Sequence, residues 1–351
     1  MRAGPGRRKD VMSRPVIAFH HALDEMDRFF PREDREALAA VAELRCLGSN
    51  DPAVILPRLA DVDILSGAWG MPRLDAALLA AAPRLKAVCY AAGSVKYFVT
   101  PECFRRGVIV TTAMYANAVP VAEVTTALIT LANKHWFACQ DRLRAAAQAD
   151  QTMVEVWRDL VDDGHPGNYR TPVGLVGLGA IGALVLDRLL AMDLEVLVYD
   201  PYCDPARLPA GPVRLVDDLV EMAAAVQVLS LHAPDIDACR HMINAQVLAA
   251  LPDGATLINT ARGRLVDEAA LIAELQRGRI FAMLDVTHPE PPAQDSPLYR
   301  LPNCWLSPHR AGSSAGEIRR MGSWALAEIQ RLLRGEPVRH QVTEGMLATM
   351  A

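Results

Sequence analysis

Short apolar runs alternate with amphipathic stretches from Pro15 to about Val110. Continuous apolar runs predict buried strands, and apolar residues that recur with a period of 3.6 predict helices. By these criteria we expect strands at 16–20, 62–67, 85–91 and 107–112, and helices at 35–44 and 74–83. Strands that alternate with helices along a chain are typical of a parallel sheet.

A long helix is expected next, from about Val119 to Ala147, because no proline follows Pro120 in this stretch. It is long enough to connect two bodies. After the polar, turn-rich segment 159–172, a second α/β series begins. Its strands are predicted at 173–177, 195–200, 226–233, 255–261, 280–285 and 304–309, and its helices at 183–192, 215–225 and 267–278. An amphipathic helix is expected from about Gly316 to Arg334.

The composition excludes several classes of protein. Of the 351 residues, 51% are apolar and 22% are charged, so a fully disordered chain is excluded. The net charge of −5 argues against nucleic acid as a main partner, which would favour a basic surface. We expect no membrane span, because no apolar run approaches the roughly 18 residues required. Residues 1–14 are basic without a following apolar run, so we expect a loose arm rather than a secretory signal, with Met12 as an alternative start.

The seven cysteines are widely spaced and contain no CxxC pair. This pattern fits neither a disulfide framework nor a zinc ribbon, and it predicts reduced thiols in a cytoplasmic protein.

The strongest local motif is a glycine-rich segment between a predicted strand and a predicted helix. It consists of Gly177, Leu178, Gly179, Ala180, Ile181 and Gly182. Its first glycine permits a tight turn, the second allows the backbone to approach a pyrophosphate, and the third allows the helix to pack on the strand. The helix N-terminus offers free N–H groups to phosphate. Asp200 ends the next strand, where a carboxylate accepts both ribose hydroxyls, so we expect NAD rather than NADP.

A second motif runs from Asn259 to Glu268, after one strand and before a helix. The carboxyl ends of parallel strands face the ligand crevice of an open sheet. Arg262 is therefore placed to bind a carboxylate through two parallel hydrogen bonds. Arg264 is the alternative within the same motif.

Two later strand ends carry the remaining candidate chemistry. Glu290 lies in the proline-rich loop after 280–285, and His309 follows the strand at 304–309. A histidine paired with a carboxylate is an acid/base group suited to neutral pH. A metal site from His288, Glu290 and His309 lacks helix-spaced ligand pairs, so we expect no metal.

As a set, these motifs resemble the D-isomer-specific 2-hydroxyacid dehydrogenase family. The matching segments occur in the family's order: GLGAIG with Asp200, LHAP at 231–234, NTARGRLVDEAAL at 259–271, LDVTHPEP at 284–291 and SPHRAG at 307–312. Residues 117–123 also resemble the start of the family's interdomain helix.

The resemblance implies two Rossmann-like, doubly wound parallel-sheet domains. An NAD-binding domain of residues 119–315 would be inserted into a substrate domain of residues 15–118 and 316–351. The active site would lie between the domains, and the protein would be a homodimer. The expected partner is a small 2-hydroxy or 2-oxo acid, with no nucleic acid and no membrane.

The resemblance also implies roles for single residues. Arg262 would bind the substrate's carboxylate and carbonyl oxygen, His309 would be the general acid/base, and Glu290 would orient His309. The expected cofactor residues are Gly177, Leu178, Gly179, Ala180, Ile181, Gly182, Tyr199, Asp200, Pro201, His232, Ala233, Pro234, Thr260, Ala261, Asp285 and Gly312. The expected substrate loop contributes Ala92, Gly93 and Ser94.

That substrate loop departs from the family's pattern. The family commonly has GxGxDN, whereas this chain has AAGSVKY at 91–97, and Trp69, Met114 and Tyr115 add bulk nearby. We therefore do not expect a substrate typical of the family, such as glyoxylate or phosphoglycerate. Two other functions remain open at this point: a non-enzymatic NAD(H) sensor similar to a co-repressor of the same fold, and an interaction protein with a relic nucleotide fold.

Overall fold

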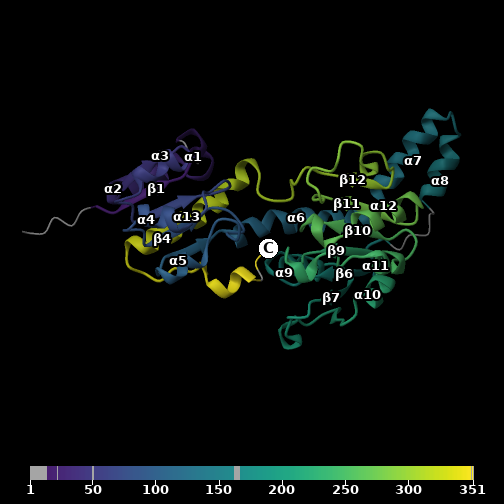
Figure 1. Ribbon diagram of the computed structural model, residues 1–351. Helices are drawn as coiled ribbons and strands as arrows, with labels where there is room; N and C mark the ends of the chain where they lie inside the picture. The colour runs from purple at the N-terminus through teal and green to yellow at the C-terminus, as the bar shows by residue number, and fades with distance from the viewer. Residues whose placement is uncertain (1–13, 22, 50, 162–166, 349, 351) are drawn as a thin grey trace, which may run out of the picture. The chain divides into compact units, whose positions relative to one another are not determined.

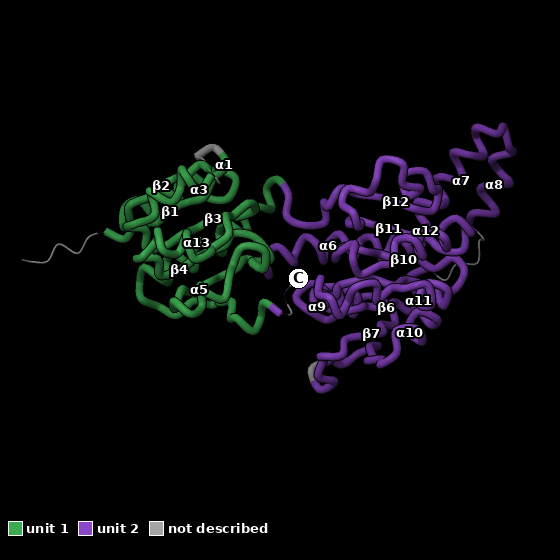
Figure 2. The backbone as a smooth tube through the Cα atoms, in the orientation of Figure 1, with its two compact units in different colours: residues 1–113, 315–347 green, residues 114–314, 348–351 purple. Residues whose placement is uncertain are grey.

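A computed structural model describes residues 14–21, 23–49, 51–161, 167–348 and 350 (Figure 1). The chain forms two compact units (Figure 2). Unit 1 contains residues 1–113 and 315–347, and unit 2 contains residues 114–314 and 348–351. Unit 2 is therefore inserted into unit 1, and each unit contains a largely parallel sheet, which confirms the predicted fold class. The expected N-terminal arm lies outside the described residues except for Arg14.

Unit 1 contains a six-stranded sheet with the order β2-β1-β3-β4-β5-β13. Only β13 runs antiparallel to its neighbour, β5. The inner strands are buried on both faces, as their continuous apolar runs predict. The strands are β1 (Val16–Phe19), β2 (Glu43–Cys46), β3 (Ile64–Gly67), β4 (Ala87–Tyr90), β5 (Ile109–Thr112) and β13 (Gln341–Val342).

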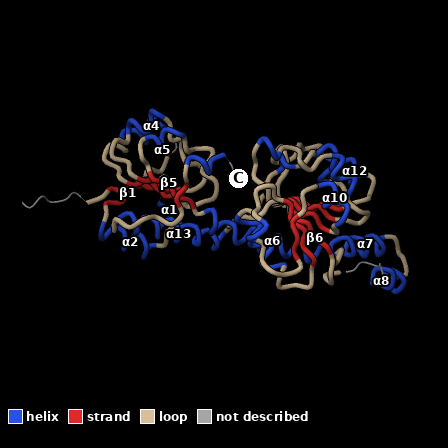
Figure 3. The backbone as a smooth tube through the Cα atoms, turned by 90° about the horizontal axis from the view of Figure 1, so that it is seen from below, coloured by secondary structure: helices blue, strands red, loops and turns tan. Residues whose placement is uncertain are grey.

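Helices cover both faces of the unit 1 sheet: α4 and α5 lie on one side and α2 and α13 on the other (Figure 3). The helix α13 returns from the far end of the sequence and packs closely on α1. A Cβ atom on Gly322 would lie 1.8 Å from the carbonyl oxygen of Phe29, so only glycine fits there. The helices are α1 (Leu23–Phe29), α2 (Arg32–Val41), α3 (Pro52–Ile55), α4 (Ala76–Ala81), α5 (Pro101–Arg105) and α13 (Ile318–Leu333).

Unit 2 contains a seven-stranded sheet with the order β8-β7-β6-β9-β10-β11-β12, and every pair is parallel. The strand order reverses between β6 and β9, which is where open α/β sheets bind ligands. The strands are β6 (Pro172–Val176), β7 (Glu195–Tyr199), β8 (Val213–Leu215), β9 (Val228–Leu231), β10 (Thr256–Asn259), β11 (Phe281–Leu284) and β12 (Cys304–Leu306).

The unit 2 helices also lie on both faces of their sheet, while α7 and α8 extend beyond it (Figures 1 and 3). They are α6 (Met114–Ala132), α7 (Trp136–Gln148), α8 (Met153–Val161), α9 (Ala180–Leu189), α10 (Leu219–Ala225), α11 (Ala245–Ala250) and α12 (Glu268–Gln276).

The prediction of one continuous helix from 119 to 147 is wrong. The segment is two helices, α6 and α7, because His135 adopts a left-handed backbone conformation with φ +45°. Its Nε2 atom lies 3.1 Å from the carbonyl oxygen of Gly254, and this contact ties the break to the loop before β10. The expected helix at 35–44 is also partly wrong, since α2 ends at Val41 and the edge strand β2 begins at Glu43.

By length and apolar composition α6 could cross a membrane, but its surroundings are those of a core helix. It packs against α9 and against β9 and β10 of the same unit. Nine of its residues are buried, among them Thr125 and Ile129. We therefore interpret α6 as a buried helix of unit 2.

Candidate active site

The glycine-rich segment leaves β6 and enters α9 through a turn that depends on its glycines. Gly177 has φ +96°, and a Cβ atom there would lie 2.8 Å from the backbone nitrogen of Ala233. A Cβ atom on Gly182 would lie 2.2 Å from the carbonyl oxygen of Gly177. These two glycines are therefore required by the fold itself.

Gly179 is different, because a Cβ atom there would meet nothing within 4 Å. Gly179 is also the N-cap of α9, and no side chain caps that end of the helix. The open space and the uncapped backbone N–H groups suit a phosphate, which would also be favoured by the helix dipole. The segment thus fits the pyrophosphate of a dinucleotide.

Asp200 follows β7 and lies against this turn. Its Oδ2 accepts a hydrogen bond from the N–H of Leu178 at 2.7 Å, and its Oδ1 accepts one from the N–H of Tyr202 at 2.9 Å. The Leu178 N–H is therefore used within the protein. Each carboxylate oxygen has a further lone pair, so the side chain can still accept ribose hydroxyls.

His232 follows β9 on the opposite side of the strand-order reversal and lies under the glycine turn. The Cβ atom of His232 lies 3.4 Å from the position that a Cβ atom on Gly182 would occupy. The Nε2 atom lies 3.1 Å from Ser230 Oγ, whereas the buried Nδ1 atom has no partner within the described residues. Burial lowers the pKa of His232 to about 3, so the ring is neutral at physiological pH.

Arg262 and Arg264, the two candidates for binding a substrate carboxylate, differ in whether they already form ion pairs. Arg264 is bound to Asp235 at 3.1 Å and to Asp237 at 3.0 Å, so its guanidinium is already neutralised. Arg262 is half-buried, and its Nη1 donates to the carbonyl oxygen of Ala261 at 2.6 Å. Across the described residues Arg262 has no carboxylate partner, which leaves its charge for a ligand.

Three neighbouring strands, β10, β11 and β12, end at the same level of the sheet. Asn259 pairs with Leu284, and Leu284 pairs with Leu306. The loops that carry Arg262, Glu290 and His309 therefore start side by side.

Two of these loops pack tightly at Gly263. A Cβ atom on Gly263 would lie 2.0 Å from the carbonyl carbon of Thr287. The residue after Arg262 is thus held against the loop that leads to Glu290.

His309 and Glu290, predicted as a pair, are in contact. His309 Nδ1 lies 2.7 Å from Glu290 Oε1, and the two side chains are 48% and 41% exposed. This contact leaves His309 Nε2 available to a ligand. His309 has φ +51°, an uncommon backbone conformation for a histidine.

Asp285 holds the backbone around His309 in this conformation. Its backbone oxygen accepts from the N–H of His309 at 2.9 Å. Its carboxylate accepts from the N–H of Arg310 at 2.7 Å, from the N–H of Ala311 at 2.9 Å and from the hydroxyl of Ser307. The carboxylate of Asp285 thus fixes the loop that carries His309. Its expected place next to the nicotinamide stays a prediction.

Several supporting contacts were missed by sequence reasoning. The Asn259 side chain closes the loop that carries Arg262, accepting from Ala261 N–H at 3.0 Å and donating to the carbonyl oxygen of Arg262 at 2.9 Å. Thr260 Oγ1 lies 2.8 Å from Thr125 Oγ1 of α6. A pair of polar residues 135 positions apart leaves no signal in a single sequence.

The residues of the expected substrate loop follow β4 and belong to unit 1. Thr112 Oγ1 donates to the carbonyl oxygens of Ala92, at 3.0 Å, and Gly93, so the loop backbone is anchored. In the part of the chain that is described, the N–H groups of Gly93 and Ser94 donate to no protein acceptor. They are therefore free to bind an anion.

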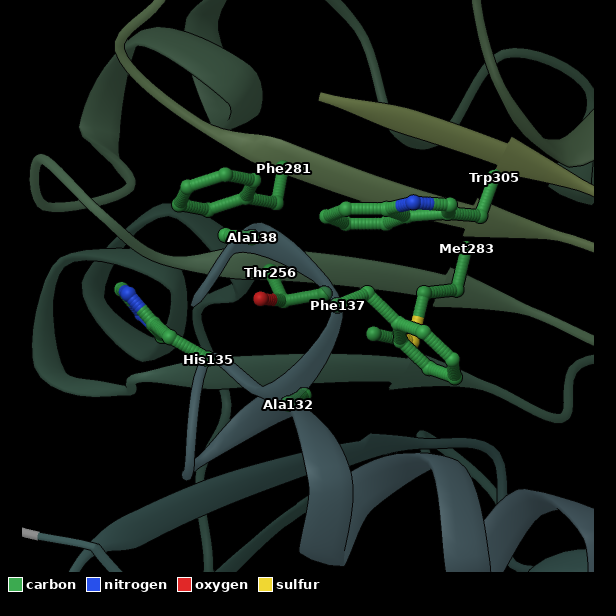
Figure 4. Close-up of a pocket in the computed structure, with 8 residues that line it drawn as sticks. All are labelled: Ala132, His135, Phe137, Ala138, Thr256, Phe281, Met283 and Trp305. Carbon is green, nitrogen blue, oxygen red and sulfur yellow. The ribbon is translucent and has the colours of Figure 1, made fainter. Parts of the chain in front are cut away.

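Unit 2 also contains a small cavity, whose lining side chains are drawn in Figure 4. Thr256 and Phe281 begin β10 and β11, so the cavity is at the opposite end of the strands from Arg262 and Glu290. At about 10 Å³ it could hold one water molecule. Its lining residues are Ala132, His135, Phe137, Ala138, Thr256, Phe281, Met283 and Trp305.

The described residues contain no group of three or more His, Cys, Asp or Glu side chains suited to a metal ion. All seven cysteines are free thiols.

Residues 138–311 match the NAD-binding domain of the D-isomer-specific 2-hydroxyacid dehydrogenases. A glyoxylate reductase of Thermofilum pendens is 32% identical over 75% of this chain and 76% of its own length. The chain belongs to this 2-hydroxyacid dehydrogenase family. NAD is the cofactor of the domain that unit 2 contains.

Two further relatives place the chain within the 2-hydroxyacid dehydrogenases. A D-3-phosphoglycerate dehydrogenase of Mycobacterium leprae is 33% identical over 86% of this chain, but this chain spans only about half (54%) of that protein. The crystal structure of a 2-hydroxyacid dehydrogenase from Ketogulonicigenium vulgare has a TM-score of 0.73 at 25% identity, covering 95% of this chain and 99% of that one. The family and its fold are therefore established.

Proposed function

We propose that this protein is an NAD-dependent dehydrogenase that interconverts a 2-hydroxy acid and a 2-oxo acid. The observation that carries the proposal is the 2.7 Å contact of His309 with Glu290, in the same unit as the open glycine turn. A relic of the nucleotide fold would have no need for a proton-transfer pair in that unit. Membership of the family supports the same conclusion.

The proton chemistry belongs to His309. His309 Nδ1–H would donate a hydrogen bond to Glu290, which orients the ring and leaves Nε2 to exchange a proton with the substrate oxygen. Proton donation from Nε2 accompanies reduction of the 2-oxo acid, and proton acceptance accompanies oxidation of the 2-hydroxy acid. When bound, the nicotinamide supplies or accepts the hydride.

The substrate's carboxylate would be held by Arg262. Its unpaired guanidinium can donate two parallel hydrogen bonds to a carboxylate, and can also polarise the adjacent carbonyl oxygen. The free N–H groups of Gly93 and Ser94, with Ala92, would supply further donors from the substrate loop.

The cofactor would be held by the strand ends of unit 2. The N–H groups at the start of α9 would bind the pyrophosphate, and Asp200, between Tyr199 and Pro201, would bind the adenosine ribose. His232, Ala233 and Pro234 would underlie the cofactor. Thr260, Ala261, Asp285 and Gly312 would line the nicotinamide end, with Asp285 acting mainly through the His309 loop.

We also propose that the protein is a cytoplasmic homodimer in which unit 1 binds the substrate. The seven free thiols fit a reducing compartment. The helix α8 presents Val154, Trp157 and Val161, which are 69%, 62% and 70% exposed, and a second copy would cover this apolar face. A Trp157→Glu variant should then run as a monomer in size-exclusion chromatography with light scattering.

The deciding experiment is NADH oxidation with a panel of 2-oxo acids. Turnover with at least one acid supports the proposal. Binding of NADH without turnover of any acid would indicate a sensor of NAD(H) instead. Absence of NADH binding in a fluorescence titration would overturn both functions.

A further inference from the structure

The sheet of unit 1 also contains a reversal of strand order. Its strand order reverses between β1 and β3, since β2 lies on one side of β1 while β3, β4 and β5 follow on the other. Open α/β sheets bind ligands at the carboxyl ends of the strands beside such a reversal. His21 follows β1 at this position, and Ala68 and Trp69 follow β3.

Trp69 is a large apolar side chain left half-exposed at this position. It is 46% exposed, and its ring packs against that of Phe29 with centroids 5.9 Å apart. Phe29 is only 3% exposed and is fixed in the core. The indole therefore has a rigid support on one side and a free surface on the other.

His21 completes the support. Its ring is stacked on Phe29 at 5.4 Å with an angle of 5° between the planes. His21 Nε2 accepts the N–H of Ala68 at 3.1 Å, and Nδ1 lies 3.3 Å from Glu25 Oε2. Burial lowers the pKa of His21, which favours the neutral ring. The support of Trp69 is thus well ordered and aromatic.

Tyr97 lies on the next loop, three residues after Ser94, and is 52% exposed. Its hydroxyl is hydrogen-bonded to Tyr90 and to the backbone of Gly70, the residue after Trp69. The bond to Gly70 joins the loop after β4 to the loop after β3, and the bond to Tyr90 ties Tyr97 to the end of β4. Burial raises the pKa of Tyr97, so the phenol is neutral at physiological pH.

We propose that Trp69 and Tyr97 bind the side chain of the substrate, and that this side chain is aromatic. The inference rests on the proposed function, and it names the class of 2-oxo acid: one with an aryl group beyond the carbonyl. Aromatic pairs gain about 0.5–1.5 kcal/mol beyond simple burial. A one-carbon or methyl substituent would leave both rings in water, and a phosphate would face two uncharged rings.

Lys96 favours a different class of substrate, one that carries a second anionic group. It is exposed on the same loop, next to Tyr97, and an ammonium group would favour a substrate with a second anion. We favour the aromatic class because the strand-order reversal itself is lined by Trp69, Phe29 and His21. The competing class is included in the test.

The test compares kcat/KM of the full chain with NADH and four acids: glyoxylate, pyruvate, phenylpyruvate and 3-phosphohydroxypyruvate. We expect phenylpyruvate to have the highest value, by at least tenfold over pyruvate. A highest value for glyoxylate, pyruvate or the phosphorylated acid would overturn the inference and leave the proposed function standing. Turnover of none of the acids, or of a wider 2-oxo acid panel, would overturn the proposed function.

Substitutions then locate the effect. Trp69→Leu should lower kcat/KM for phenylpyruvate about tenfold and change the value for pyruvate less than twofold, whereas Trp69→Phe should keep most of the activity. Trp136→Leu is the matched control, since Trp136 is 60% exposed on α7 and belongs to unit 2. An equal loss with both acids in Trp69→Leu, or no loss, would contradict the assignment of Trp69.

Discussion

Replacing Asp200 with asparagine tests whether its carboxylate selects NAD over NADP. Two unit charges about 4 Å apart repel by about 4 kcal/mol at an effective dielectric constant of about 20, which corresponds to about a thousandfold. Because Asp200 is only half-buried, solvent reduces this to tens- to hundreds-fold. We therefore expect wild-type kcat/KM to favour NADH over NADPH by at least tens-fold, and Asp200→Asn to lose most of that preference.

The structure also predicts a small cost of this substitution. The carboxylate accepts one N–H on each oxygen, from Leu178 and Tyr202, and an asparagine can accept only one of them. The free energy of unfolding should fall by about 1 kcal/mol. The loss of cofactor preference is therefore measured as a ratio, which a uniform loss of stability does not change.

Asp204→Asn is the matched control. Asp204 lies on the same loop and also accepts a backbone N–H, from Ala206 at 3.0 Å. The assay is kcat/KM for NADH and for NADPH with one accepted 2-oxo acid, in all three proteins. Equal wild-type values, an unaltered ratio in Asp200→Asn, or the same change in Asp204→Asn would refute the assignment of Asp200 as the ribose ligand.

Four further outcomes are expected. His309→Gln should lower kcat by about 10²–10⁴-fold without weakening NADH binding measured by fluorescence, and near-normal turnover would remove His309 from the mechanism. Arg262→Lys should lower kcat/KM for the 2-oxo acid but not NADH affinity; the opposite pattern would assign Arg262 to the cofactor. Gly263→Ala should lower the Tm, because its Cβ would lie 2.0 Å from the Thr287 carbonyl carbon, and an unchanged Tm would contradict this packing. His232 has a folded-state pKa of about 3 against 6.5 unfolded, so the unfolded state binds the extra proton as the pH falls. Wild-type stability should decline below pH 6.5 by about 1.4 kcal/mol per pH unit relative to His232→Asn in denaturant titrations, and parallel curves would exclude this effect.

The glycine turn could be predicted because its requirements are local. A positive φ at Gly177 and the close approach of Gly182 to the Gly177 carbonyl depend on a few consecutive residues. The contact of Glu290 with His309 was predictable as well, because adjacent parallel strands bring their carboxyl ends together. Local backbone requirements and sheet topology were thus sufficient to predict the glycine turn and the contact of Glu290 with His309.

The missed features depend on contacts that are distant in sequence. The edge strand β2 has the mixed sequence ELRC, and it is a strand only because Val16–Phe19 pairs with it. The structural use of Asp285 depends on a loop more than 20 residues away. The break between α6 and α7 includes His135, which contacts the carbonyl oxygen of Gly254, and a single sequence carries no trace of such a partner.

The insertion of unit 2 has a consequence for synthesis of the chain on the ribosome. Unit 1 needs α13 on α1 and β13 at the edge beside β5, and both elements follow residues 114–314 of unit 2 in the sequence. Unit 2 can therefore begin to fold before α13, the last helix of unit 1, has been synthesised. The N-terminal segment of unit 1 must remain incomplete, with its β5 edge unpaired, until α13 and β13 have emerged.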